Sequence, residues 1–156
     1  MLLRHAKSDW PDVSDQARPL AKRGRRDAPA VGRWLRDHGY LPDVVVCSTA
    51  RRTRQTWELI APVLDGSPSV TFEPRAYGAS AMALLYLASE LPGRCRNALI
   101  IGHNPGISDL AASLDAGESH LRFPTAAVAV LEFGGDWPDL APGHTRLLDF
   151  AVPDDM

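Results

Sequence analysis

The sequence has little of what marks secreted, membrane-spanning or polyanion-binding proteins. Its 156 residues include two cysteines, enough for one bridge but no sign of a small fold stapled by disulfides. No apolar run is as long as a membrane-spanning helix, and the first motif begins almost at Met1, so we expect no signal peptide. A formal net charge of −2 does not suggest a nucleic-acid-binding surface. These features predict a cytoplasmic protein with reduced thiols and without membrane or nucleic-acid partners.

Strand-like apolar runs alternate with helix-like stretches, which is the pattern of an α/β domain. We find no repeat or linker and predict one domain over residues 1–156. Strands are expected at residues 1–3, 43–48, 70–73, 98–101, 126–133 and 146–151. Helices are expected at residues 28–38, from the second strand to near 62, after 80, and from 104 to about 114. The predicted fold is a three-layer α/β sandwich with a mostly parallel central sheet.

Capping residues suggest where two of these helices begin and end. Asp27 is a candidate N-cap of the first helix, and Gly39 is its stop. That helix could instead begin near Ala21, and Pro29 would then lie inside it and kink it. Asn104 is a candidate N-cap of the last helix, with a proline in the first turn.

Three segments that carry reactive side chains, residues 2–8, 47–56 and 100–106, each follow a predicted strand. Parallel sheets bind ligands at the carboxyl ends of their strands, so the three segments are expected at one edge. In the first, a neutral His5 can attack phosphorus while Arg4 offsets the charge of the phosphoryl oxygens. In the third, His103 precedes a helix start and can donate to a phosphoryl oxygen. Taken singly, each histidine is equally consistent with an ordinary loop.

The second segment brings three arginines to the start of a helix, at positions 51, 52 and 54. Helix N-termini favour anions, and the guanidinium fork matches phosphate oxygens. At least two of these arginines are expected on a solvated helix face. The segment also tests a rival, because cysteine phosphatases need arginine six positions after the nucleophile. Neither Cys47 nor Cys95 has arginine at that distance.

Together the three segments resemble the histidine phosphatase superfamily, which also contains the cofactor-dependent phosphoglycerate mutases. Within it the sequence is most similar to the SixA-type phosphohistidine phosphatases. The resemblance runs from residue 2 to about residue 131. Its segments are Arg4-His5-Ala6, Ser48 with Arg52, Gly102-His103-Asn104-Pro105-Gly106, Arg18-Pro19-Leu20 with Gly24, Tyr77-Gly78-Ala79-Ser80 and Phe123-Pro124-Thr125.

The resemblance implies a phosphoglycerate-mutase-like fold and a role for each matching residue. His5 matches the nucleophile that becomes phosphorylated. Arg4 and Arg52 match the two phosphate-binding arginines, and His103 matches the second histidine across the phosphoryl group. Ser8 matches a position near the phosphate. No cofactor or metal is implied.

The sequence departs from the mutase pattern at two places. Mutases carry asparagine three residues after the serine that Ser8 matches, where this chain has Pro11. They also carry a glutamate, the general acid, three residues before the tyrosine that Tyr77 matches, where this chain has Pro74. Glu73, one residue earlier, is the candidate general acid, and the alternative for it is a surface carboxylate at a strand end.

The presence or absence of a general acid decides which leaving groups the site can release. An alcohol leaves poorly unless it is protonated, whereas phosphohistidine releases imidazole, whose conjugate acid has a pKa of about 6.5. The sequence therefore favours a phosphatase for phosphohistidine on proteins. Three alternatives stay open: a phosphatase of small phosphomonoesters, a non-catalytic phosphoprotein-binding module, and a metallohydrolase that uses His5 and His103.

Overall fold

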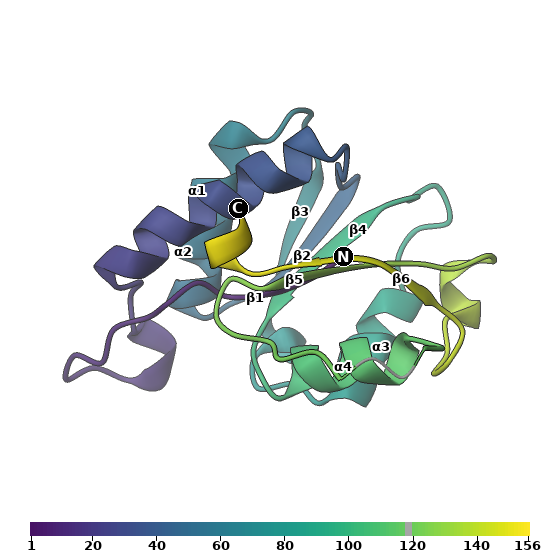
Figure 1. Cartoon of the computed structure of the whole chain (residues 1–156). Helices are drawn as coiled ribbons and strands as arrows, with labels where there is room; N and C mark the ends of the chain where they lie inside the picture. Colours follow the sequence, from purple (N-terminus) through teal and green to yellow (C-terminus); the bar gives the residue numbers. More distant parts are fainter. Residues whose placement is uncertain (118–119) are drawn as a thin grey trace.

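Six strands form one mixed sheet, and helices cover both of its faces (Figure 1). The computed structural model describes residues 1–117 and 120–156. The strands are β1 (Leu2–Arg4), β2 (Val44–Ser48), β3 (Ser69–Glu73), β4 (Ala98–Gly102), β5 (Val128–Glu132) and β6 (Arg146–Ala151). The helices are α1 (Lys22–Asp37), α2 (Arg51–Ile60), α3 (Ala81–Ser89) and α4 (Gly106–Leu114), with short 3-10 turns that include η1 (Asp15–Ala17) and η3 (Pro74–Ala76).

The strand order β3-β2-β4-β1-β5-β6 places the strands that precede the three motifs side by side. β3, β2, β4 and β1 run parallel, while β5 and β6 are antiparallel to their neighbours. The prediction of a three-layer α/β fold with a mostly parallel sheet is confirmed. Since β1, β4 and β2 are adjacent and parallel, their carboxyl ends lie at one edge of the sheet.

Two hydrophobic cores fill the space between the sheet and its helices. α1 and α2 pack on one face, and α3 and α4 pack on the other (Figure 1). Consecutive residues of a strand alternate between the cores: Leu2 contacts the α3 and α4 side, and Leu3 the α1 and α2 side. This two-sided burial explains why the central strands are continuous apolar runs. Among the described residues, no helix is long and apolar enough to cross a membrane.

The first helix begins at Lys22 rather than at residue 28, next to the alternative start at Ala21. Pro29 therefore lies inside α1. Asp27 is not the N-cap: its carboxylate is buried within the helix and pairs with Arg23 and Arg26. These ion pairs stabilise a carboxylate that burial alone would disfavour. Gly39 follows the end of the helix with φ +74°, as its role as a stop requires.

The start of α4 also differs from the prediction. The helix begins at Gly106, and Asn104 precedes a cis peptide bond to Pro105 rather than occupying the N-cap. The Asn104 side chain nevertheless satisfies a helix donor, because its Oδ1 accepts a hydrogen bond from the backbone N–H of Ser108 at 3.3 Å. A close approach fixes Gly106 itself: a Cβ there would lie 2.1 Å from the carbonyl oxygen of Ala79.

Candidate active site

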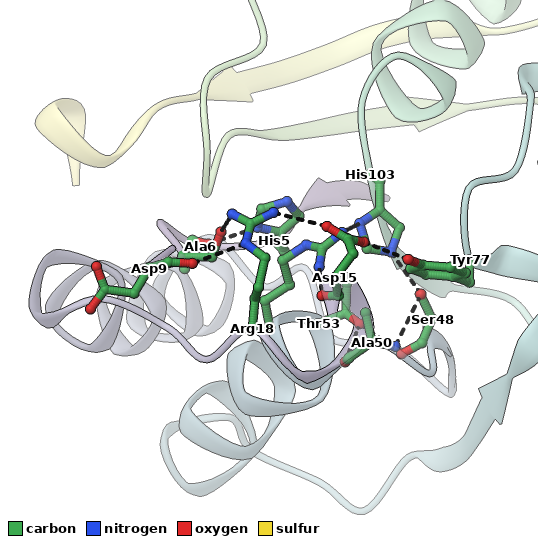
Figure 2. A network of polar contacts seen from close by, with 12 residues as sticks. His5, Ala6, Asp9, Asp15, Arg18, Ser48, Ala50, Thr53, Tyr77 and His103 are labelled. Carbon is green, nitrogen blue, oxygen red and sulfur yellow. Dashed lines mark hydrogen bonds and ion pairs between the residues drawn. The ribbon is translucent and has the colours of Figure 1, made fainter. Parts of the chain in front are cut away.

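Three strand ends bring the reactive side chains of the three motifs together (Figure 2). His5 follows β1, Ser48 ends β2, and His103 follows β4. The imidazole centroids of His5 and His103 are 5.4 Å apart, and both residues are buried. Arg52, in the first turn of α2, reaches the same place, since its Nη2 lies 3.3 Å from Nδ1 of His103. The expected convergence at one sheet edge is therefore present.

Local hydrogen bonds set the tautomer of His5. Its Nδ1 lies 2.7 Å from the carbonyl oxygen of Ala6, which can only accept, so Nδ1 carries the proton. The lone pair of Nε2 is then available for attack. Burial, reinforced by the positive charges of Arg52 and Arg4, lowers the pKa of His5 to about 3. His5 is thus neutral at physiological pH, which is the nucleophilic form.

The turn that carries His5 is held by α1 and α2. The backbone N–H of Ala6 donates to Oγ1 of Thr56 at 3.0 Å, and this hydroxyl donates to the backbone carbonyl of Arg52 at 2.7 Å. On the α1 side, a Cβ on Gly24 would lie 2.1 Å from the carbonyl oxygen of Lys7. Gly24 is required because the backbone of α1 packs directly against this turn.

His103 is held from both sides of its ring. Its Nε2 lies 2.7 Å from Oγ of Ser48, and its Nδ1 accepts from Nη2 of Arg52. Burial, together with the charge of Arg52, lowers the pKa of His103 to about 4. A phosphate dianion beside Nδ1 would favour protonation of this nitrogen and turn it into a donor.

The two arginines at this site offer hydrogen-bond donors that the protein leaves unused. Within the part of the chain that the structure describes, Nε of Arg4 and Nε of Arg52 are buried and have no hydrogen-bond partner. Arg4 is oriented by a bond from Nη1 to the carbonyl oxygen of Phe123, which also accepts from Asn104. A buried N–H without a partner costs free energy, so two of them beside two neutral histidines indicate a site for an oxyanion.

Sequence reasoning missed Asp15, which lies in η1 and binds the outer edge of Arg52. Its carbonyl oxygen accepts from Nη1 of Arg52 at 2.8 Å, and its Oδ2 accepts from Nη2 at 3.1 Å. The hydroxyl of Tyr77 donates to the same Oδ2 at 2.5 Å, and Arg18 donates to Oδ1 at 3.0 Å. Tyr77 and Arg18 stood within recognised segments without an assigned role. The one sequence signal for the contact between Asp15 and Arg18 is that the two residues lie three positions apart.

The two remaining predicted site residues, Ser8 and Glu73, each bond to an arginine outside the four predicted catalytic residues. Ser8 is buried, and its Oγ accepts from Nη2 of Arg18 at 2.7 Å. The carboxylate of Glu73 pairs with Arg75 at 2.8 Å, which lowers its pKa. Ser48 was part of a motif but not among the predicted site residues, although it contacts His103 directly.

Neither cysteine has the character of a reactive thiol. Both are reduced and buried, and burial raises the pKa of Cys47 to about 12. In the described ranges, 1–117 and 120–156, no three side chains of His, Cys, Asp or Glu are grouped so that they could hold a metal ion.

Comparison with known proteins assigns the family. Residues 1–76 match the model of the histidine phosphatase superfamily, branch 1. An uncharacterized protein of Mycobacterium tuberculosis is 37% identical over 161 aligned residues, covering 97% of this chain and 99% of that protein. The chain belongs to the histidine phosphatase superfamily. It is a phosphatase and hydrolase of the SixA-like kind, with the phosphoglycerate-mutase-like fold.

Two solved structures of this superfamily resemble the whole chain. One, from Nakamurella multipartitia, is provisionally assigned as phosphohistidine phosphatase SixA; it has a TM-score of 0.88, with 33% identity over 97% of this chain and 95% of that one. The other is the protein histidine phosphatase SixA complexed with tungstate, with a TM-score of 0.79 and 25% identity over 98% of this chain and 96% of that one.

The lowered pKa values of the two buried histidines of this superfamily member predict how its stability depends on pH. Unfolding restores an ordinary histidine pKa of 6.5, so the unfolded chain binds more protons than the folded protein between pH 6.5 and about 4. The contribution of these two neutral histidines to the free energy of unfolding is therefore complete above pH 6.5 and is lost as the pH falls. We expect the free energy of unfolding, measured with urea, to drop by up to about 1.4 kcal/mol per pH unit for each histidine.

The variant His5→Ala is expected to reduce that slope by the contribution of one histidine. The matched control is His144→Ala, at a histidine that is exposed. An unaltered slope in His5→Ala would mean that His5 is not kept neutral by folding.

Proposed function

We propose that this phosphatase hydrolyses phosphohistidine on proteins and that His5 carries the phosphoryl group as a covalent intermediate. The observation that supports this most is the pairing of a neutral, oriented His5 with the two unpartnered Nε–H groups of Arg4 and Arg52. His5 would attack phosphorus, and the two Nε–H groups would donate hydrogen bonds to the phosphoryl oxygens. The resemblance to a protein histidine phosphatase that binds tungstate, a tetrahedral oxyanion, supports the same assignment.

In the first step, Nε2 of His5 attacks phosphorus, and the bond between phosphorus and the substrate nitrogen breaks. The electron pair of that bond stays with the substrate ring. Arg4, Arg52 and a protonated His103 would stabilise the charge on the equatorial oxygens, which is the main contribution a protein makes to phosphoryl transfer.

In the second step, water attacks the phosphorylated His5 and releases phosphate. Nδ1 of His5 keeps its proton throughout, because it donates to the carbonyl of Ala6. The phosphorylated ring is therefore a cation, and breaking its P–N bond returns a neutral imidazole directly. The water proton passes to the phosphate and solvent.

The site supports a nitrogen leaving group better than an oxygen one. The Glu73 carboxylate pairs with Arg75, and the Tyr77 hydroxyl, Arg18 and Arg52 hold the pKa of Asp15 far below its usual range. Neither carboxylate is placed to donate a proton to a departing alkoxide at neutral pH. Imidazole needs no such donor, because it leaves as a neutral molecule when its other nitrogen is protonated.

Kinetic preference tests the proposal. The wild-type protein is assayed on a histidine-phosphorylated protein and on a panel of sugar and amino-acid phosphates, and the kcat/KM values are compared. We expect a clear preference for phosphohistidine and a phosphoenzyme whose label maps to His5 by mass spectrometry. Faster turnover of the phosphomonoesters would mean that these, and not phosphohistidine, are the substrate class. A label on another residue would mean that His5 is not the nucleophile.

Glu73→Gln is predicted to leave phosphohistidine hydrolysis within about twofold of wild type, because the leaving imidazole needs no acid. The matched control is Glu58→Gln, an exposed carboxylate on α2. A loss of alkyl phosphate hydrolysis in Glu73→Gln alone would identify Glu73 as a general acid and favour the small-molecule alternative.

A further inference from the structure

Asp15 stands at the mouth of the site, on a segment that the three motifs do not include. Resting on the proposed function, we propose that the Asp15 carboxylate stabilises the positively charged, phosphorylated imidazole of the substrate and so selects N-phosphoryl over O-phosphoryl substrates. Asp15 would thus be a specificity-determining residue rather than a proton donor.

Burial shows where Asp15 lies relative to the phosphate-binding groups. The Asp15 side chain is 50% exposed, whereas the side chain of Arg52 is 8% exposed and that of Arg18 is 9% exposed. His5 and His103 are buried as well. The carboxylate therefore lies between solvent and the buried groups, and Figure 2 shows it beside Arg18, His103 and Tyr77.

The geometry of phosphoryl transfer brings the leaving group to this side. The attacking and leaving atoms lie on opposite sides of phosphorus, and the attacking His5 is buried. The leaving ring belongs to a protein substrate that approaches from solvent, so it departs on the solvent side. Asp15 and Tyr77, which contact each other there, are the groups that it meets.

The charge of Asp15 suits a cationic leaving group. Its carboxylate accepts hydrogen bonds from Tyr77, Arg18 and Arg52, and these bonds hold its pKa far below the usual range, so it stays ionised. Reactive N-phosphoryl imidazole carries a proton on its second nitrogen and is positive. A carboxylate nearby attracts this ring and can accept its N–H. When the P–N bond breaks, the electron pair stays on the ring nitrogen and the ring leaves neutral with its proton.

The same charge opposes an oxygen leaving group. Negative charge accumulates on the departing oxygen of an ester, and an ionised carboxylate beside it raises the energy of that transition state. Discrimination thus has an attractive part for the nitrogen substrate and a repulsive part for the oxygen substrate. A purely structural Asp15, which only orients Arg52 through two hydrogen bonds, would affect both substrates equally.

Asp15→Asn separates these roles because it removes the charge and keeps the size. The substrates are N-phosphoryl imidazole and p-nitrophenyl phosphate, both too small to depend on protein docking. We expect kcat/KM for N-phosphoryl imidazole to fall about tenfold or more relative to that for p-nitrophenyl phosphate. Tungstate affinity, measured by calorimetry, is expected to remain close to wild type. Asp12→Asn, on the same exposed segment, is the charge-matched control.

Equal losses on both substrates, accompanied by weaker tungstate binding, would overturn the inference and leave Asp15 as a positioning residue for Arg52. An unchanged ratio without any loss would overturn it too. The proposed function is judged separately, on the wild-type preference for a phosphohistidine protein over phosphomonoesters. The proposed function can therefore fail without changing the ratio of the two kcat/KM values in Asp15→Asn, and the two failures are distinguishable.

Discussion

His5→Ala is expected to abolish turnover while the protein still folds and binds tungstate. The substitution removes the Nε2 lone pair, but Arg4, Arg52 and His103 still supply donors to an oxyanion. Steady-state assays should show a loss of at least about a thousandfold, as expected when a covalent nucleophile is removed. Calorimetry with tungstate and a phosphoenzyme assay measure the two consequences separately.

The control for this prediction is the exposed His144→Ala, which should retain full activity. Two outcomes would contradict the role of His5. One is substantial residual turnover in His5→Ala, and the other is a phosphoenzyme that still forms in that variant.

Arg52→Ala is expected to lower kcat about a hundredfold or more, because it removes a buried charge-stabilising donor. Arg51 and Arg54 flank it on the same helix but are exposed, so Arg51→Ala and Arg54→Ala should change kcat less than about twofold. Arg52→Lys should rescue little, because an ammonium group cannot bind Asp15 and a phosphoryl oxygen at once with a planar fork.

Similar losses in all three alanine variants would mean that the cluster contributes general positive potential rather than one oriented donor. That result would be seen as a strong dependence of kcat/KM on salt in the wild type. If Arg52 acts as one oriented donor, kcat/KM should depend only weakly on salt concentration.

The part of the site that could be predicted from sequence is the part that strand order dictates. His5, Arg52 and His103 each follow a strand of a parallel sheet, so they meet at one edge whatever the details of the loops. Arg4 belongs to the same group, because it ends β1. The α/β class followed from the alternation of apolar runs for the same reason.

The part that could not be predicted depends on side-chain partners that lie far apart in sequence. Asp15 looks like an exposed loop acid until Arg52 and Tyr77, 37 and 62 residues away, are placed beside it. Asp27 looked like a helix cap because the sequence left open whether α1 begins at Ala28 or near Ala21, and the earlier start places Asp27 inside the helix, where it is buried. Glu73 was a candidate acid because it lies one residue from the position of the mutase glutamate, and the sequence did not show that Arg75 pairs with it.

The position of β1 in the sheet makes the assembly of this site a matter of long loop closure. In the part of the chain that the structure describes, β1 pairs with β4 and β5, so Leu2 and Leu3 have their partners at Ile100, Ile101, Ala129 and Val128. The segment between β1 and β4, about a hundred residues, must close into a loop before these two strands can pair. The conformational entropy of that loop is lost before the contacts between the strands compensate for it. His5, the proposed nucleophile, follows a strand in the first few residues of the sequence, yet both strands that pair with β1 lie in the second half of the chain.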